Sequence, residues 1–162
     1  MDKLIFARKN NEVKIPSKKS HNAGYDIYAF FEDEELLINP HETKMIPTGL
    51  YSAFGEEYYI QLVERGSTGS KGIAQRCGVI DSSYRGEWFV PITNTTNKEL
   101  VISKKVKETT VTKDYIAYPY NKAICQAVLL PVPKVEIKEI SIDEFLKLES
   151  DRGTGCLGSS GK

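Results

Sequence analysis

The sequence has few of the residues that build disulfide frameworks and metal centres. Its 162 residues include only three cysteines, Cys77, Cys125 and Cys156, which are scattered without CxxC spacing. An odd, scattered set argues for reduced thiols in a cytosol. The two histidines, His21 and His41, fit no metal-ligand spacing, and the signature of the zinc-dependent nucleobase deaminases is missing. We therefore expect a cytoplasmic protein without a protein-held metal cage, although a metal that arrives with a substrate stays open.

An excess of either charge and a long apolar run are also lacking. The 22 basic residues balance 22 acidic ones, so there is no basic field of the kind that attracts nucleic acid. No apolar run is long enough to span a bilayer, and the polar beginning MDKLIFARKNNEVK is unlike a signal peptide. We expect neither a membrane nor nucleic acid as a partner.

Long helical periodicity is missing as well, whereas short strand-like runs are frequent. Gly, Pro, Asn or charged clusters separate these runs at the spacing of sandwiches and barrels. The runs are KLIFAR, ELLI, TKMIPTGLYSAF, EYYIQLVER, CGVID, EWFVPITNT, KELVIS, AICQAVLLPV and KVEIKEI. IDEFLKLES and TGSKGIAQR are the two candidates for short helical turns. The pattern predicts one all-β domain over residues 1–148, with a jelly-roll-like arrangement of two sheets.

Two regions have the composition of peripheral segments. Residues 103–120, SKKVKETTVTKDYIAYPY, are rich in Lys and Thr and then turn aromatic, which predicts an extended hairpin or loop. Residues 149–162, ESDRGTGCLGSSGK, are almost half glycine and serine, which predicts a mobile arm.

The stretch GVIDSSYRGEW, residues 78–88, takes a buried strand end directly into a carboxylate. Ser82 and Ser83 indicate the turn of a tight hairpin, which places Asp81 where the strand leaves the core, partly shielded from water. Tyr84 returns on the other arm with its ring available to cover a ligand. The alternative is an ordinary turn aspartate that hydrogen-bonds its own backbone.

Two glycine-rich stretches have the residues of an anion site. The tail matches GxGxxG but ends too soon for the helix and strand that a dinucleotide fold requires. Its Arg152, Ser159 and Ser160 could instead hold a phosphate, unless the segment is only a loose terminus. ERGSTGSKGI, residues 64–73, offers Arg65, Ser67 and Thr68 after a strand, either as an anion-binding turn or as an ordinary polar loop.

Polar side chains within apolar strands need partners. Asp26 in HNAGYDIYAF pairs with a neighbouring cation, or helps to hold a hydrated Mg²⁺ carried in by a polyphosphate. Gln126 in KAICQAVLL belongs either to a core hydrogen-bond network or to the same site.

Taken in order, AGYDIYA, ERGSTGSKGI, GVIDSSYRGE, KAICQAVL and RGTGCLGSSG resemble the five ordered motifs of the trimeric all-β dUTPases, the deoxyuridine triphosphate nucleotidohydrolases. MIPTGL, between the first two, is also similar to that family. The resemblance covers nearly the whole chain. It implies a jelly-roll-like dUTPase fold with a mobile glycine-rich C-terminal arm, and cleavage of dUTP to dUMP and pyrophosphate with Mg²⁺ on the triphosphate. Such an enzyme keeps uracil out of DNA and supplies dUMP.

The resemblance also implies roles for single residues. Asp81 matches the aspartate that activates the attacking water, and Tyr84 matches the tyrosine that packs on the deoxyribose. Asp26 would meet the metal only through water. The other residues matched to substrate contacts are Arg65, Gly66, Ser67, Gln75, Gly78, Val79, Ile80, Phe89, Gln126, Arg152, Leu157, Gly158, Ser159 and Ser160. Uracil in this family is bound by the backbone of Gly78 to Ile80.

The chain departs from the family pattern at three of these positions. Gly66 stands where the family has a serine, and Ser67 beside it is the candidate to replace that serine. Gln75 stands where an asparagine is frequent, and Leu157 replaces the aromatic residue that stacks on uracil. The family shares each active site among three subunits, so a homotrimer is expected, with the arm of one subunit closing a neighbour's site.

Two alternatives stay open. The related dCTP deaminases, including bifunctional members that also cleave the triphosphate, have an Arg-Ser-Ser that RGSTGSKG faintly matches. A regulatory protein on a dUTPase scaffold would bind its partner at residues 103–120, where Tyr115, Tyr118 and Tyr120 lie near lysines. Otherwise this segment is a longer surface hairpin.

Overall fold

The structure is a computed structural model that describes residues 3–76 and 78–155. Its internal contacts divide the chain into one unit that ends at Val132 and a second that starts at Pro133. The compact unit therefore ends before residue 148, where the sequence predicted the domain boundary. No helix in the described ranges is long and apolar enough to cross a membrane.

The first unit contains the strands, and the helices are short. The elements in chain order are β1 (Ile5–Arg8), β2 (Gly24–Ile27), β3 (Glu35–Ile38), β4 (Thr43–Pro47), β5 (Leu50–Ala53), β6 (Tyr58–Val63), α1 (Gly66–Gly69), β7 (Ile73–Gln75), β8 (Val79–Ile80), β9 (Phe89–Asn94), β10 (Glu99–Ser103), β11 (Thr110–Val111), β12 (Tyr115–Pro119), β13 (Cys125–Pro131) and α2 (Ile142–Phe145). The all-β prediction is confirmed, and α2 begins the predicted IDEFLKLES turn. The turn predicted over TGSKGIAQR overlaps α1 only at its first two residues, because IAQ forms β7.

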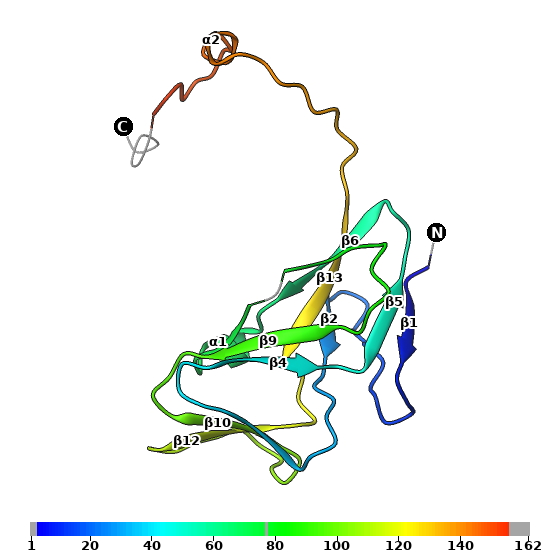
Figure 1. Cartoon of the computed structure of the whole chain (residues 1–162), viewed down its shortest axis with the longest axis vertical. Coiled ribbons are helices and arrows are strands. Elements are labelled where there is room, and N and C mark those ends of the chain that lie inside the picture. The colour runs from blue at the N-terminus through cyan, green and yellow to red at the C-terminus, as the bar shows by residue number, and fades with distance from the viewer. Residues whose placement is uncertain (1–2, 77, 156–162) are drawn as a thin grey trace. The chain divides into compact units, whose positions relative to one another are not determined.

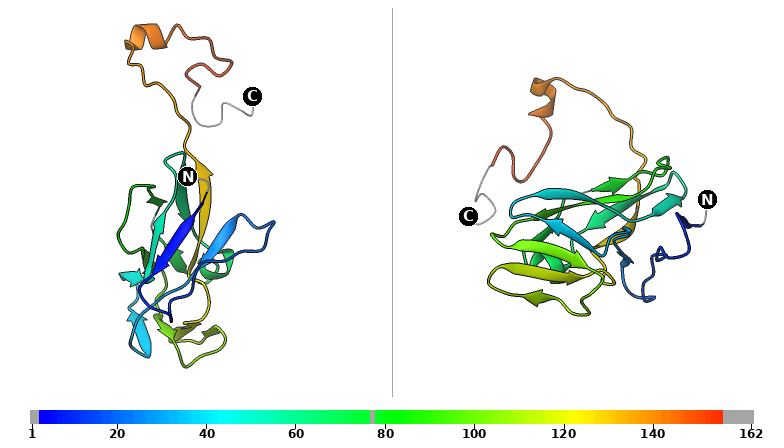
Figure 2. Two further views of the ribbon diagram at one scale, coloured as in Figure 1. Left: turned by 90° about the vertical axis from the view of Figure 1, so that its right-hand side faces the viewer. Right: turned by 60° about the horizontal axis from the view of Figure 1, so that its bottom comes forward.

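Backbone hydrogen bonds join the strands into four small sheets, where the sequence predicted two. Their orders are β1-β5, β11-β12-β10-β3, β2-β13-β6-β8 and β4-β9-β7. All neighbours run antiparallel except β10 and β12, which are parallel. The strands are too short and strongly interrupted to sustain two continuous ladders, so the layers of Figure 2 consist of separate ladders.

The core of the first unit is packed by alternate residues of these strands. Trp88, Ile27, Ile46 and Ile92 are almost fully buried. The Trp88 ring meets Phe6 edge to face with 5.7 Å between ring centroids, and its indole N–H donates to Ser52 Oγ over 3.2 Å. A buried indole thus keeps its hydrogen bond while it fills the centre of the core.

Residues 103–120 are less peripheral than their composition indicates. β12 pairs with β10 on one side and with β11 on the other, so it lies inside a four-stranded sheet (Figure 1). Ile116 and Tyr118 are buried, at 2% and 3% exposure. A surface made by Tyr115, Tyr118 and Tyr120 is therefore wrong, because Tyr118 belongs to the core and Tyr120 packs on Phe31.

The strand predicted over KVEIKEI is absent. Residues 132–140 have no strand assignment, and Val135 and Ile137 are 76% and 94% exposed. Apolar residues at alternate positions are typical of a strand, but a strand also needs a partner for its backbone groups. None of the described strands of the same chain pairs with this segment.

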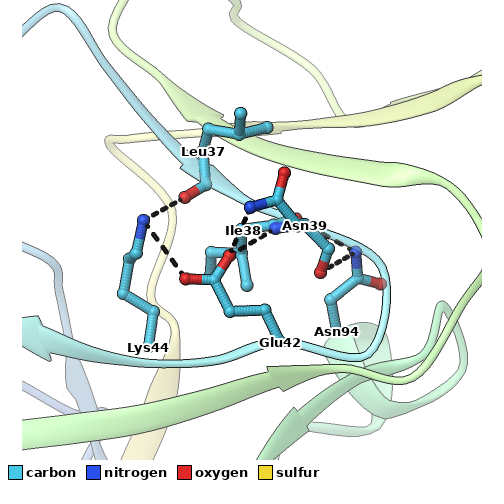
Figure 3. Close-up of polar contacts among 6 residues, drawn as sticks. All are labelled: Leu37, Ile38, Asn39, Glu42, Lys44 and Asn94. Atoms are coloured by element: carbon cyan, nitrogen blue, oxygen red, sulfur yellow. Dashed lines mark hydrogen bonds and ion pairs between the residues drawn. The ribbon is translucent and has the colours of Figure 1, made fainter.

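The β3–β4 turn is fixed by polar side chains (Figure 3). The Glu42 carboxylate accepts from the Asn39 backbone N–H over 2.7 Å, and His41 adopts a left-handed φ of 61°. These bonds lower the pKa of the Glu42 carboxyl, and the Lys44 ammonium acts in the same direction. The contribution of Glu42 to stability is therefore present above its ordinary pKa of 4.5 and is lost as the pH falls through the lowered value.

Asn94, at the end of β9, ties this turn to the β9–β10 connection. Its buried side-chain amide donates to the carbonyl oxygens of Ile38, Asn39 and Lys98 at 3.1, 3.2 and 2.6 Å. Its backbone carbonyl accepts from His41 N–H over 2.8 Å. One fully buried side chain thus satisfies three carbonyl groups from two turns.

Replacement of Asn94 by alanine should lower the free energy of unfolding by about 2–4 kcal/mol, because three carbonyls lose their donor and a buried cavity opens. Chemical denaturation monitored by Trp88 fluorescence would measure the change. Asn97→Ala is the matched control, since the exposed Asn97 amide makes one hydrogen bond, to His41. Equal midpoints for the two variants would contradict the role given to Asn94.

Candidate active site

Asp81 and Tyr84 line one cavity of about 290 Å³ on the first unit. The cavity lies where β8 ends and β9 begins. Its other lining residues are Met45, Val79, Ile80, Glu87, Phe89 and Pro91. Five candidate residues from the sequence (Val79, Ile80, Asp81, Tyr84 and Phe89) are therefore brought together.

The connection between β8 and β9 is not the predicted hairpin. β8 pairs with β6, whereas β9 pairs with β4 and β7, so the turn leads from one sheet to another. Asp81 opens a turn that is closed by the Tyr84 N–H donating to the Asp81 carbonyl over 3.1 Å. Asp81 is exposed, where the sequence predicted partial shielding.

The Asp81 carboxylate is available to a ligand. The turn uses the backbone carbonyl of Asp81, and within residues 3–76 and 78–155 no hydrogen bond or ion pair is formed by its side chain. The alternative of a turn aspartate that caps its own backbone is therefore wrong. A carboxylate left without protein donors at the edge of a cavity can accept a hydrogen bond from water or a hydroxyl.

Tyr84 is held in a defined position. Its hydroxyl donates to the Glu87 carbonyl over 2.8 Å, and the ring lies against Gly86. A Cβ at position 86 would stand 2.4 Å from the Tyr84 hydroxyl oxygen. Glycine at this position therefore lets the tyrosine fold back over its own turn, with 43% of the side chain exposed to the cavity.

Residues of the MIPTGL stretch hold the 81–88 turn in place through hydrogen bonds. Thr48 Oγ1 donates to the Trp88 carbonyl over 2.7 Å, and the Gly49 N–H donates to Glu87 Oε1 over 2.9 Å. Gly49 has a φ of +67°, and a Cβ there would stand 2.5 Å from Val13 Cγ2. Only glycine tolerates both the positive φ and the close approach of Val13. Gly49 can therefore place its N–H against Glu87 and fix the turn that carries Tyr84.

β8 leaves one of its edges unpaired, because it is the last strand of its sheet. Leu62 N–H donates to the Gly78 carbonyl over 2.7 Å, and Ile60 stands opposite Ile80. Backbone groups of alternate residues point to opposite sides of an antiparallel strand, so the N–H and C=O of Val79 face away from β6. This edge offers a donor and an acceptor beside the cavity.

A second group of candidate residues surrounds Arg65. The guanidinium Nε lies 3.7 Å from Asp26 Oδ1, and Nη1 donates to the Ala123 carbonyl over 2.8 Å. Gln126 Nε2 donates to Asp26 Oδ1 over 3.2 Å. Asp26 thus pairs with a cation and Gln126 joins a hydrogen-bond network, as the simpler alternatives for both residues predicted. The β2–β13 register that aligns Gln126 with Asp26 causes this arrangement.

Two tyrosines complete this cluster. The Tyr118 hydroxyl donates to the Ala123 carbonyl over 2.7 Å and accepts from Arg65 Nη1 over 3.4 Å. Burial raises the pKa of Tyr118, while Arg65 opposes the shift. Burial also raises the pKa of Tyr28, with a further rise from the Asp26 carboxylate. Both hydroxyls therefore stay protonated at neutral pH and can donate hydrogen bonds.

Gly66, Ser67 and Gln75 lie near this cluster in the chain. Gly66 and Ser67 begin the single turn of α1, and no atom lies within 4 Å of a Cβ built on Gly66. The fold thus has space for a serine where the chain has Gly66. Gln75 ends β7, and its backbone N–H donates to Glu64 Oε2 over 3.1 Å.

The candidate residues of one chain thus form two groups without a common cavity. No residue of the Arg65 cluster lines the Asp81 cavity. Arg152 lies in the second unit, where its Nε donates to the Gly155 carbonyl over 3.0 Å. Leu157, Gly158, Ser159 and Ser160 lie outside the described residues.

Comparison with known proteins decides the family. The dUTPase family model matches residues 11–108. The deoxyuridine 5′-triphosphate nucleotidohydrolase of Nautilia profundicola is 32% identical over 99% of both chains, and that of Finegoldia magna is 34% identical over 98% of this chain and 99% of the relative. The chain belongs to the dUTPase family.

Solved dUTPase structures have the same fold. A mutant dUTPase of Staphylococcus bacteriophage 80alpha, with dUpNHpp, covers 100% of both chains with a TM-score of 0.76 and 23% identity. A dUTPase from phage phi11 of S. aureus covers 86% of this chain and 96% of its own, with a TM-score of 0.67 and 21% identity. The all-β dUTPase fold inferred from five short motifs is confirmed.

Asp26 is the candidate residue for contact with a metal ion. Residues 3–76 and 78–155 contain no group of three His, Cys, Asp or Glu side chains able to hold a metal ion. Asp26 Oδ1 is engaged by Arg65 and Gln126, which leaves Oδ2 as the oxygen that can accept from a metal-bound water. One carboxylate oxygen suits contact through water and does not form a cage.

Sequence reasoning missed the residues that hold this dUTPase site in shape. Glu87, Trp88 and Thr48 brace the Asp81 turn, and Glu64 accepts from the backbone N–H of Gln75 at the end of β7. GEW and PTGL are visible in the sequence as motifs, but the contact between them depends on the pairing of β4 with β9. The spacing of the two motifs along the chain does not predict that they are in contact.

Gly49→Ala should destabilise the fold by about 2–4 kcal/mol, because alanine is strained at positive φ and its Cβ collides with Val13. Gly66→Ala is the matched control, since nothing stands within 4 Å of its added methyl group. Urea denaturation of both variants would measure the difference. If Gly49→Ala were as stable as Gly66→Ala, the brace assigned to Gly49 would be wrong.

Proposed function

We propose that this protein hydrolyses dUTP to dUMP and pyrophosphate, with Asp81 as the base that activates the attacking water. The observation that carries the proposal is the shared cavity of Asp81 and Tyr84 beside the free edge of β8. Full-length relatives named as deoxyuridine 5′-triphosphate nucleotidohydrolases support it. The reaction would keep uracil out of DNA and supply dUMP for thymidylate synthesis.

Asp81 suits this role because it lines the cavity and its carboxylate forms no hydrogen bond or ion pair within the described residues. A positioned general base contributes about 10²–10⁴-fold to a rate. The same carboxylate would accept a hydrogen bond from the sugar 3′-hydroxyl. Tyr84, fixed by its bond to the Glu87 carbonyl, would pack on the deoxyribose and leave no room for a 2′-hydroxyl.

Base selection would come from the backbone of Gly78 to Ile80. The outward N–H and C=O of Val79 match the mixed donor and acceptor edge of uracil. Cytosine presents a donor where uracil presents an acceptor, so it would leave a buried backbone group unpaired. Phe89 and Val79 supply exposed apolar area at the cavity on which the base can lie.

The phosphates would be held by the second group of residues. Arg65, Gln126 and the Gly66–Ser67 backbone supply cationic and N–H donors, as phosphate oxygens require. Mg²⁺ bound to the triphosphate would neutralise charge that develops on the phosphates, and Asp26 would contact it through water. A phage phi11 dUTPase described with a structural Mg(II) ion supports a role for this metal.

A homotrimer with shared sites follows from the separation of the two groups. A single chain keeps Asp81 and Arg65 in different places, so one chain's Asp81 cavity would meet another chain's Arg65 cluster. The exposed Val135 and Ile137, in a segment outside the described strands, supply an apolar surface for subunit contact. Arg152, Leu157, Gly158, Ser159 and Ser160 would close over the nucleotide of a neighbouring subunit.

Residues 103–120 are proposed to serve this enzyme and not a separate regulatory partner. β12 is an internal strand, and Tyr118 positions Arg65. We place the reaction in the cytoplasm, or in the host cytoplasm if the gene is phage-borne. The scattered cysteines support a reducing compartment.

Pyrophosphate release from dUTP, dCTP, dTTP and UTP with Mg²⁺, with ammonia assayed in parallel, tests the reaction. Release from dUTP alone is the expected result, because β8 selects the base and Tyr84 selects the sugar. Ammonia from dCTP would assign the chain to the dCTP deaminases, and silence on all four nucleotides would refute the proposal.

Asp81→Asn should lower kcat by about 10²–10⁴-fold, since the amide cannot take the proton from water. Assembly state and dUMP binding should be unchanged, because the side chain makes no protein contact within the described residues. Light scattering and calorimetry measure these two properties. Asp33→Asn, in an exposed turn, is the control, and near-normal turnover by Asp81→Asn would exclude the role of base.

A further inference from the structure

A second cavity, of about 420 Å³, is lined by three lysines from three separate segments. Lys71 follows α1, Lys107 lies in the β10–β11 connection, and Lys122 lies between β12 and β13. Ser67, Glu108, Thr109 and Tyr118 complete the lining. In Figure 1, α1 lies above the strands β10 and β12.

The charges in this cavity are not balanced by the protein. Three ammonium groups face one carboxylate, that of Glu108. Among the residues described, no carboxylate lies within 4.0 Å of any of the three lysine nitrogens. Lys71 Nζ donates to the Ser67 carbonyl over 2.9 Å, which fixes one ammonium at the cavity wall. Converging like charges repel one another, and a bound anion removes that cost.

Tyr118 connects this cavity to the phosphate-binding group. Its side chain lines the cavity, and its hydroxyl bonds to Arg65 Nη1 and to the Ala123 carbonyl. Tyr118 is therefore the residue that the lysine-lined cavity and the Arg65 cluster share. Ser67, which begins α1, also faces the cavity and adds a hydroxyl donor.

We propose that Lys71, Lys107 and Lys122 form a polyphosphate subsite that extends the phosphate-binding group through the 103–120 segment. The ligand is a pyrophosphoryl group, either the terminal phosphates of the bound nucleotide or free pyrophosphate. Binding of the nucleotide's terminal phosphates rests on the proposed function. Binding of free pyrophosphate does not depend on it.

The chemistry of the cavity favours a compact anion. Lysines from three separate segments line this one cavity, which suits a group with several charged oxygens, and the hydroxyls of Ser67 and Thr109 can donate further hydrogen bonds. The chain has no net charge, so the attraction is confined to this cavity and does not form a track for nucleic acid.

Pyrophosphate binding by calorimetry tests the subsite directly. Lys107→Gln with Lys122→Gln should weaken binding about tenfold, because two charge-assisted contacts are lost. The control is Lys19→Gln with Lys113→Gln, which removes the same charge at exposed positions outside the cavity. Lys71 is left intact because it bonds to the Ser67 carbonyl. Light scattering and circular dichroism confirm that both double variants fold and assemble normally.

Steady-state kinetics separate the two sources of the ligand. A raised KM for dUTP with unchanged inhibition by dUMP shows that the terminal phosphates of the nucleotide occupy the cavity, because dUMP lacks them. An unchanged KM with weakened pyrophosphate binding shows that the cavity takes free pyrophosphate.

Equal pyrophosphate affinity in the two double variants, or no pyrophosphate binding by the wild-type protein, would overturn the subsite. This result is distinguishable from failure of the proposed function. If pyrophosphate binding depends on the lysines but dUTP is not hydrolysed, the subsite is supported and the proposed function fails. If dUTP is hydrolysed normally but pyrophosphate binding does not depend on the lysines, the subsite is refuted and the proposed function stands.

Discussion

The guanidinium of Arg65 joins more of the candidate site than any other described side chain. It pairs with Asp26 on β2, donates to Ala123 before β13 and bonds to Tyr118 on β12. Each of these strands belongs to a sheet whose register is set by backbone pairing, so the cation connects two sheets at a fixed point. Arginine suits this position because its planar fork can serve several acceptors at once and stays charged when half-buried. The position of Gln126 follows, since it bonds to the same Asp26 carboxylate.

The Asp81 turn has the opposite character, because the protein holds its backbone and leaves its carboxylate free. Thr48, Gly49 and Trp88 fix the turn from within the core, and Tyr84 is held by a bond to its own loop. This division is what a water-activating group requires: a rigid support and no competing donor. Such rigidity would allow two chains to meet at the site without rearrangement of either.

The sequence predicted the chemistry better than the geometry. All-β architecture, the α2 turn and the dUTPase family follow from short strand-like runs and five motifs. The pairing of β8 with β6 and not with β9 could not be predicted, because the apolar pattern of Val79 and Ile80 fits either partner. The hairpin predicted within 103–120 is present, as β11 with β12, but its peripheral position was misjudged. Its lysines and threonines are typical of a loop, yet Ile116 and Tyr118 pack in the core. The strand expected over KVEIKEI, residues 134–140, is absent because alternating apolar residues indicate which face is buried but do not supply a strand to pair with. Tight contacts such as Gly49 with Val13 depend on tertiary structure.

The free edge of β8 bears on how this family can diverge. A recognition surface built from the N–H and C=O of Val79 does not change when the valine is replaced by another residue that keeps the strand extended. Under the proposed function, selection on base choice would act on the backbone path and on the turn beside it, and would leave the side chain of Val79 nearly neutral. Such a site tolerates drift to the one-third identity seen between this chain and its relatives. A site that reads its ligand through side chains would lose specificity at the first such substitution.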